Sequence, residues 1–307
     1  MCHKSRKKCN FAVFIMMDMH RDCATLAAIM TTRLRVWLCV AGLVVWLAAG
    51  SCNARAQFEP FALSARCRAL GGASVAMMDF SGCNVNPATL GWLHGWNVAI
   101  DYSQLLALKG MAYKSVAASI PTAKIGAAAL WYTHFGDRSY NEQTVAAQYG
   151  IKVAKQVTVG VGIYYLHSGT NDGHYENFNS ATGSVGVQYR PTEKLTFGAS
   201  VFNPFFVRRD GTYKIPVQLN AGCAYQPLKP LLLTVELEKN VYDPLRVRLG
   251  AEYCLVDRLL FQAGFATSPM VYSIGVGYRH KHIAANLCVA VHSRAGLSPG
   301  ATIVYSF

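Results

Sequence analysis

The chain ends in a stretch that alternates between two faces, Ala301-Thr302-Ile303-Val304-Tyr305-Ser306-Phe307. In an extended chain the odd-numbered residues of this stretch share one face, whereas Thr302, Val304 and Ser306 share the other. A strand that crosses a membrane in a barrel needs this period of two, because its side chains face lipid and lumen in turn. The stretch therefore predicts the last strand of an outer-membrane β-barrel.

About fourteen segments of roughly ten residues in the range 96–307 repeat this period, and ten residues is the length that a tilted membrane strand needs. In the segment 272–278, Tyr272 and Tyr278 stand at the two ends of the apolar face, where interfacial girdles lie. Short turns such as His280-Lys281 alternate with longer polar connections, as expected if both termini are periplasmic. We therefore predict that residues 96–307 form an all-β, transmembrane antiparallel β-barrel of about 14 strands.

The first 56 residues have the pattern of an export leader. Residues 36–47 form a short apolar core behind two arginines, and Ala54-Arg55-Ala56 is the small-x-small pattern that signal peptidase cleaves. This core is shorter than the roughly 20 apolar residues that a membrane-spanning helix needs. Residues 1–56 are therefore predicted to be a cleaved leader, with Met30 as an alternative true start. A lipoprotein signal that acylates Cys52 is the competing interpretation.

Removal of this leader lowers the net charge of the chain. Eight of the 29 basic and two of the 16 acidic residues precede Gln57, which leaves 21 basic and 14 acidic residues and a formal charge of +7. These basic residues are dispersed over turns, loops and one strand face, whereas a nucleic-acid binder concentrates them in a patch. The charge pattern therefore predicts no nucleic-acid partner. It fits contact with outer-membrane lipid and anionic lipopolysaccharide, or a solvated periplasmic rim.

Five of the ten cysteines follow the predicted cleavage site: Cys67, Cys83, Cys223, Cys254 and Cys288. Export places them in an oxidising compartment, where Cys67 and Cys83 are a candidate disulfide near the mature N-terminus. The odd count leaves at least one thiol free. Because no C-x-x-C spacing occurs, the sequence predicts no metal site, and it indicates no cofactor.

The pattern changes in residues 57–92, where small residues dominate and the alternation is lost. Such a segment is too irregular for a membrane strand, but its small side chains suit packing inside a barrel mouth. We therefore predict that residues 57–95 form an N-terminal plug. The candidate plug or gate residues are Leu70, Gly71, Gly72, Asn86, Pro87 and Ala88.

The stretches Leu70-Gly71-Gly72-Ala73-x-x-Ala76 and Asn86-Pro87-Ala88, and Gly277-Tyr278-Arg279 before a last hairpin, resemble the PorV/PorQ-type branch of the FadL-like (fatty-acid-transporter-like) outer-membrane proteins. The resemblance covers nearly the whole mature chain. It implies a fourteen-stranded barrel with an N-terminal plug in the outer membrane of a Gram-negative cell. By resemblance to other outer-membrane barrels, Tyr305 and Phe307 would be the signal that the barrel-assembly machinery reads.

Two groups of residues are candidates for a passage through the barrel. The first is a cluster of charges predicted to face the lumen: Glu236, Glu238, Arg246, Arg248 and Glu252. It would act as a selective polar constriction or, more simply, consist of paired charges that fill the lumen. The second group is Phe202, Phe205 and Phe206, which are either a hydrophobic mouth or ordinary girdle residues.

Enzymatic and metal-binding alternatives have weaker support. His292 and Ser293 are residue types of a lipid hydrolase, but neighbours in a regular strand point to opposite faces. Asp172, His174 and Glu176 lack the calcium-loop spacing. We therefore predict a non-enzymatic barrel that passes a hydrophobic small molecule or serves as an accessory barrel of a type IX-like secretion pathway, where its loops would hold a secretion-system protein. A lipid-modifying enzyme and a structural barrel with no passage are the alternatives.

Overall fold

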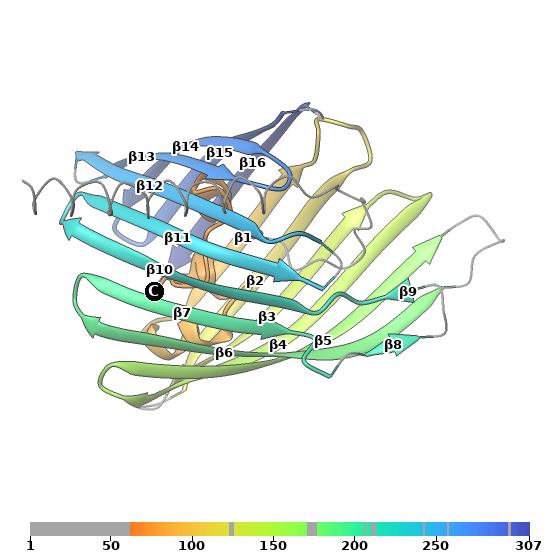
Figure 1. Ribbon diagram of the computed structural model, residues 1–307, viewed down its shortest axis with the longest axis horizontal. Helices are drawn as coiled ribbons and strands as arrows, with labels where there is room; N and C mark the ends of the chain where they lie inside the picture. The colour runs from red at the N-terminus through yellow and green to blue at the C-terminus, as the bar shows by residue number, and fades with distance from the viewer. Residues whose placement is uncertain are drawn as a thin grey trace, which may run out of the picture. The chain divides into compact units, whose positions relative to one another are not determined.

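The computed structural model describes residues 62–122, 126–170, 177–205, 207–209, 213–241, 243–256, 258–293 and 296–307. The predicted leader (1–56), Phe206 and the loop residues 172, 174 and 176 lie outside this part of the chain. Within it, fourteen antiparallel strands close into a barrel (Figure 1), so the predicted fold class and strand number are confirmed. No helix in the described residues is long and apolar enough to cross a membrane.

Neighbouring barrel strands are joined in chain order, and β1 pairs with β16 to close the barrel. The strands are β1 (Asn97–Gln104), β2 (Ala112–Thr122), β3 (Gly126–Gly136), β4 (Tyr140–Ala154), β5 (Val157–Thr170), β6 (Phe178–Thr192), β7 (Leu195–Phe202), β10 (Gln218–Leu228), β11 (Leu231–Asn240), β12 (Arg246–Val256), β13 (Leu259–Ala266), β14 (Val271–His280), β15 (Ile283–His292) and β16 (Gly296–Ser306). A separate two-stranded sheet, β8 (Arg208–Arg209) and β9 (Tyr213–Lys214), lies in the connection between β7 and β10. The alternating C-terminal stretch is thus the closing strand, with Ile303 opposite Ile100.

Side chains alternate across the barrel wall as the sequence predicts. On β5, Val161, Ile163 and Tyr165 are exposed on the outer face, whereas Tyr164 and Leu166 are buried on the inner face. Closure leaves no edge strand, so the backbone N–H and C=O groups of the wall pair with one another rather than with lipid. The outer face is therefore apolar and suited to contact a bilayer.

We call the two ends of the barrel the turn end, where β1 begins and β16 finishes, and the loop end opposite. At the turn end, Lys281 and His282 form the turn between β14 and β15, while His280 pairs with Ile283 as part of the ladder. The predicted turn at His280-Lys281 was therefore misplaced by one residue. Polar residues occupy both faces of the strand there, so the alternation gives no signal for where pairing stops.

The segment before β1 lies inside the barrel and contains three short helices: α2 (Ala65–Ala69), η1 (Phe80–Gly82) and η2 (Pro87–Trp92). We call its described part, residues 62–95, the plug segment; it is the orange element within the barrel in Figure 1. Helix α2 contacts β1 and β13–β16, whereas η2 contacts β3–β6 on the other side of the lumen. Leu70 and Leu90 are fully buried, so the plug segment forms a core with the inner wall.

Candidate functional site

Inner-wall glycines lie where the plug segment comes closest. A Cβ atom added at Gly186 would overlap Asn86 Oδ1, and one added at Gly264 would overlap the backbone nitrogen of Gly71. At Gly250 the added atom would lie 2.7 Å from Leu70 Cβ. These strands therefore approach the plug segment at distances that exclude any side chain. Gly186, Gly250 and Gly264 are therefore contact positions for the plug segment.

Asn86 fixes the second half of the plug segment. Its Oδ1 accepts the N–H of Ala88 at 3.0 Å and caps η2, which Pro87 begins. Its Nδ2 donates to the carbonyl oxygen of Val75 within the segment at 2.7 Å and to that of Val187 in the wall at 3.3 Å. The three predicted residues, Asn86, Pro87 and Ala88, are thus a buried anchor, and a gating role for them stays a prediction.

The first half of the plug segment is held by the predicted charge cluster. Glu236 is fully buried and accepts the backbone N–H groups of Ser74 and Val75 at 2.6 and 2.8 Å. Arg248 bonds to Glu236 Oε1 at 3.3 Å and donates to the carbonyl oxygen of Gly72 at 3.0 Å. The predicted candidates Leu70, Gly71 and Gly72 lie at this contact with the wall.

The cluster divides into two groups. Glu238 pairs with Arg246 at 2.7 Å and also with Arg248, which places four of the five predicted residues together. Glu252 instead accepts two hydrogen bonds from Arg66 of the plug segment, at 2.7 and 2.6 Å. Arg66 was not among the predicted site residues, although an arginine in a segment predicted to lie in the lumen needs an acidic partner there.

The predicted disulfide is absent. Cys67 and Cys83 are free and buried; Cys67 Sγ donates to the carbonyl oxygen of Ser81 at 3.4 Å, and Cys83 Sγ to that of Asp79 at 3.9 Å. Each thiol therefore has its own acceptor in the fold. Burial raises the pKa of the Cys67 thiol to about 12, so the reactive thiolate is scarce at neutral pH.

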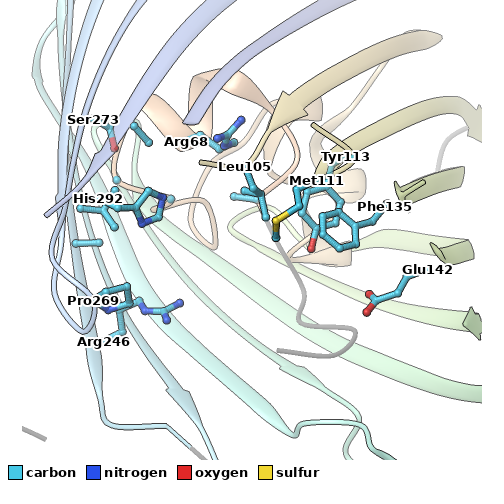
Figure 2. Close-up of a pocket in the computed structure, with 18 of the residues that line it drawn as sticks. Arg68, Leu105, Met111, Tyr113, Phe135, Glu142, Arg246, Pro269, Ser273 and His292 are labelled. Atoms are coloured by element: carbon cyan, nitrogen blue, oxygen red, sulfur yellow. The ribbon is translucent and has the colours of Figure 1, made fainter. Parts of the chain in front are cut away.

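A cavity of about 650 Å³ lies between the plug segment and the loop end (Figure 2). Arg246 and His292 lie on one wall, and Tyr113 and Phe135 lie on the opposite wall. Further lining residues are Arg68 and Gly72 from the plug segment, Leu105 and Met111 from the β1–β2 connection, Glu142 from β4 and Arg248 from β12. The side with Tyr113 and Phe135 is therefore mainly apolar, with Glu142 beside it, and the opposite side carries a cationic group, Arg246.

A smaller cavity of about 80 Å³ shares Tyr113 and Phe135 with the first. It is lined further by Trp131, Tyr164 and Phe202, and the Phe202 ring meets the Tyr164 ring edge-on with their centroids 5.1 Å apart. The apolar side of the large cavity thus continues into an aromatic part of the lumen core.

Phe202 and Phe205, two of the three phenylalanines predicted to line a mouth, lie in different environments. Phe202 is buried in the lumen, Phe205 is 76% exposed, and Phe206 lies outside the described residues. The chain turns at Asn203, which adopts a φ of 54° and whose Oδ1 accepts the Val207 N–H at 3.0 Å. This local turn separates Phe202 from Phe205, and the period of two could not predict it.

The remaining candidate residues lie at the two ends of the barrel. His292 lines the large cavity from β15, and Ser293 follows the end of that strand. Tyr305 and Phe307 are exposed at the turn end with their rings 4.6 Å apart, and their role in assembly stays a prediction. Among the described residues, no group of three or more His, Cys, Asp or Glu side chains is placed to hold a metal ion.

Comparison with known proteins supports the fold. No family model matches the chain, and no curated protein matches its sequence. Among solved structures, the CymD monoaromatic hydrocarbon channel has a TM-score of 0.60 at 13% identity, covering 82% of this chain and 99% of that one. The Pseudomonas putida toluene transporter TodX has a TM-score of 0.61 at 12% identity, covering 81% and 98%. A Pseudomonas aeruginosa FadL homologue has a TM-score of 0.57 at 12% identity, covering 81% and 99%.

Identities this low establish a shared fold and no more. The chain therefore shares its barrel fold with these channels and transporters, and this is the fold that the sequence resemblance implies. The PorV/PorQ-type branch of the FadL-like superfamily stays a prediction.

Proposed function

We propose that this protein is a non-enzymatic passage for small hydrophobic molecules, with the 650 Å³ cavity as its ligand site. The observation that supports this most directly is the composition of the cavity. Met111, Tyr113 and Phe135 form a wall that would bury the apolar body of a ligand. Arg246 and His292 on the opposite wall would offer hydrogen-bond donors to a polar group on the same molecule.

The proposed location is the outer membrane, with the loop end outside the cell and the turn end in the periplasm. Two observations support it, namely the apolar outer face and the fold shared with a FadL homologue, and the export leader predicted for residues 1–56 agrees with it. Partners in this setting would be membrane lipid and the barrel-assembly machinery. The plug segment would separate the cavity from the periplasm, so passage requires that segment to shift.

Ligand binding by the purified full-length protein tests the proposal. Phe135→Ala removes an aromatic ring from the cavity wall, whereas Tyr132→Ala removes a ring of similar size from the outer face of the same strand. We expect Phe135→Ala to weaken binding of a small aromatic probe about tenfold, since losing a buried ring costs more than the 1.4 kcal/mol that a factor of ten represents. Tyr132→Ala should bind like the unmodified protein. Equal affinities for all three proteins would contradict the proposal.

The PorV/PorQ-type resemblance implies a second candidate function, an accessory role in a type IX-like secretion pathway. The two functions differ in what the purified protein should retain. A passage should retain small apolar molecules through purification, and mass spectrometry would detect them. An accessory barrel should instead retain a protein partner in stoichiometric amount. Recovery of such a protein, with no small molecule bound, would favour the accessory role.

A further inference from the structure

The outer wall has a polar hollow at the loop end. Its volume is about 560 Å³, and it is lined by outward-facing residues of β1–β4 and by the two connections above them. Lys114 lies at its centre in the ladder, opposite Tyr102 on β1 and His134 on β3. The neighbours of Lys114 in sequence, Tyr113 and Ser115, point to the opposite side, so the hollow faces the surroundings of the barrel and not its lumen.

The hollow is predominantly cationic. Lys114, Lys109 from the β1–β2 connection and Arg138 from the β3–β4 connection are exposed and line it. Asp137 is the acidic residue among the described lining residues, and its Oδ1 already accepts the backbone N–H groups of Ser139 and Tyr140 at 2.8 and 3.3 Å. The described lining of the hollow thus has three cationic side chains and one carboxylate, Asp137, and that carboxylate is already hydrogen-bonded to the backbone of its own loop. Neutral donors and acceptors complete the lining: Tyr102, Gln104, His134, Asn141 and Gln143.

An apolar strip begins directly below the hollow. The next outward-facing residues on the same four strands are Ile100, Val116, Tyr132 and Val145, which pair in register across the wall. Each is between 43% and 60% exposed. A cationic hollow above an apolar strip matches a molecule with an anionic head and long apolar chains. Such a molecule would place its head among the cations and its chains along the wall.

We propose that this hollow binds the phosphorylated head of lipopolysaccharide in the outer leaflet, a site that rests on the proposed outer-membrane orientation. Arginine and lysine both bind phosphate, arginine through its planar fork and lysine as a point charge. Three cations from one strand and two connections suit a head that carries two phosphates better than a phospholipid with one. Lys239, a further outward cation near the loop end, donates to the carbonyl oxygen of Asp243 in its own loop instead.

Native mass spectrometry of the full-length protein in detergent, after addition of purified lipopolysaccharide, tests the site. The test variant is Lys114→Glu with Arg138→Glu; Lys109 stays unchanged because it also lines the lumen cavity. The matched control is Lys155→Glu with Lys194→Glu, which makes the same charge change on exposed turns at the turn end. We expect the test variant to retain at least tenfold less lipopolysaccharide than the other two proteins. Equal retention by all three would overturn the site.

Two further measurements test which ligand the hollow binds and whether this site is independent of the proposed passage function. Inorganic phosphate or phosphatidylglycerol that displaces lipopolysaccharide at equal concentration would show a general phosphate or phospholipid site and overturn the assignment. Binding of the aromatic probe in the lumen is measured on the same variants and should not change, because Lys114 and Arg138 do not line that cavity. Loss of lipopolysaccharide with normal probe binding supports the site. If Phe135→Ala fails to weaken probe binding, the proposed function fails and the lipopolysaccharide result still stands.

Discussion

Arg66 of the plug segment and Glu252 of β12 form a two-pronged ion pair, with Nε and Nη2 donating to the carboxylate at 2.7 and 2.6 Å. Both side chains are buried, and Asp79 within the segment also pairs with Arg66. A buried charge without a partner costs several kcal/mol, so this contact joins the plug segment to the wall energetically as well as sterically.

The ion pair predicts strong coupling between its two residues. Arg66→Met leaves Glu252 buried without its cation and should lower the free energy of unfolding by about 3–5 kcal/mol, whereas Glu252→Met leaves Arg66 paired with Asp79 alone and should lower it less. The double variant removes both charges and should be closer to the unmodified protein than either single variant is. Urea titrations of protein folded into lipid vesicles measure all three. Additive losses in the double variant would show that the pair is solvated and weak.

The close approach of Gly264 to the plug segment predicts that a single methyl group displaces that segment. Gly264→Ala should destabilise the protein by about 1–3 kcal/mol, because the added Cβ would meet backbone atoms that cannot move aside. Gly169→Ala is the control, since its Cβ would make ordinary contacts of 3.4 Å or more. Limited proteolysis should then cut the plug segment in Gly264→Ala while the barrel resists. Protection of the segment equal to that in the control would argue against the close contact.

The free-energy cost of an arginine on the outer face should depend on how deep in the membrane it lies. Val161 is exposed in the middle of β5, whereas Gln143 faces outward near the loop end of β4. Val161→Arg should therefore cost about 2–4 kcal/mol in a bilayer, and Gln143→Arg only about 0–1 kcal/mol. Folding titrations in vesicles would compare them. The same cost at both positions would mean that the outer face does not contact the hydrocarbon core as assigned.

The terminal residue predicts an assembly defect. Phe307 is 68% exposed beside Tyr305, and its N–H donates to the carbonyl oxygen of Trp96 at 2.9 Å. Phe307→Asp should lower the amount of folded protein in outer membranes, because the signal expected for the assembly machinery loses its aromatic end. Phe205→Asp changes another exposed phenylalanine at the loop end and should have little effect. Membrane levels and heat-modifiable gel mobility of the two variants decide the point.

The wall could be predicted from sequence because each residue of a strand is assigned to a face by its neighbours alone. The alternation in 301–307 needed no knowledge of distant residues, and the inward direction of Glu236 and Arg248 followed from the same rule. The rule carries no information about an irregular segment. The pairing of Arg66 with Glu252, 186 positions away in the chain, therefore went unseen.

Two of the corrected predictions grouped residues by their nearness in the chain. Cys67 and Cys83 were paired from their compartment and nearness in sequence, but both thiols are free, and each lies within hydrogen-bond distance of a backbone carbonyl oxygen. Phe202 and Phe205 were grouped by proximity in the chain, but the turn at Asn203 separates them. In both cases local backbone geometry, which hydrophobic patterning does not encode, decided the outcome.

Single-channel conductance in planar bilayers tests the central claim most directly, namely that the plug segment closes a passage through this barrel. The comparison is between the mature protein and a variant without residues 57–95, each first shown to be folded by heat-modifiable mobility. We predict that the intact protein stays closed to small ions and that the deletion variant conducts, because the exposed inner face would be lined by glycine, serine, threonine and charged groups. Identical closed behaviour of the two proteins would show that the wall's own side chains fill the lumen, and would contradict the passage.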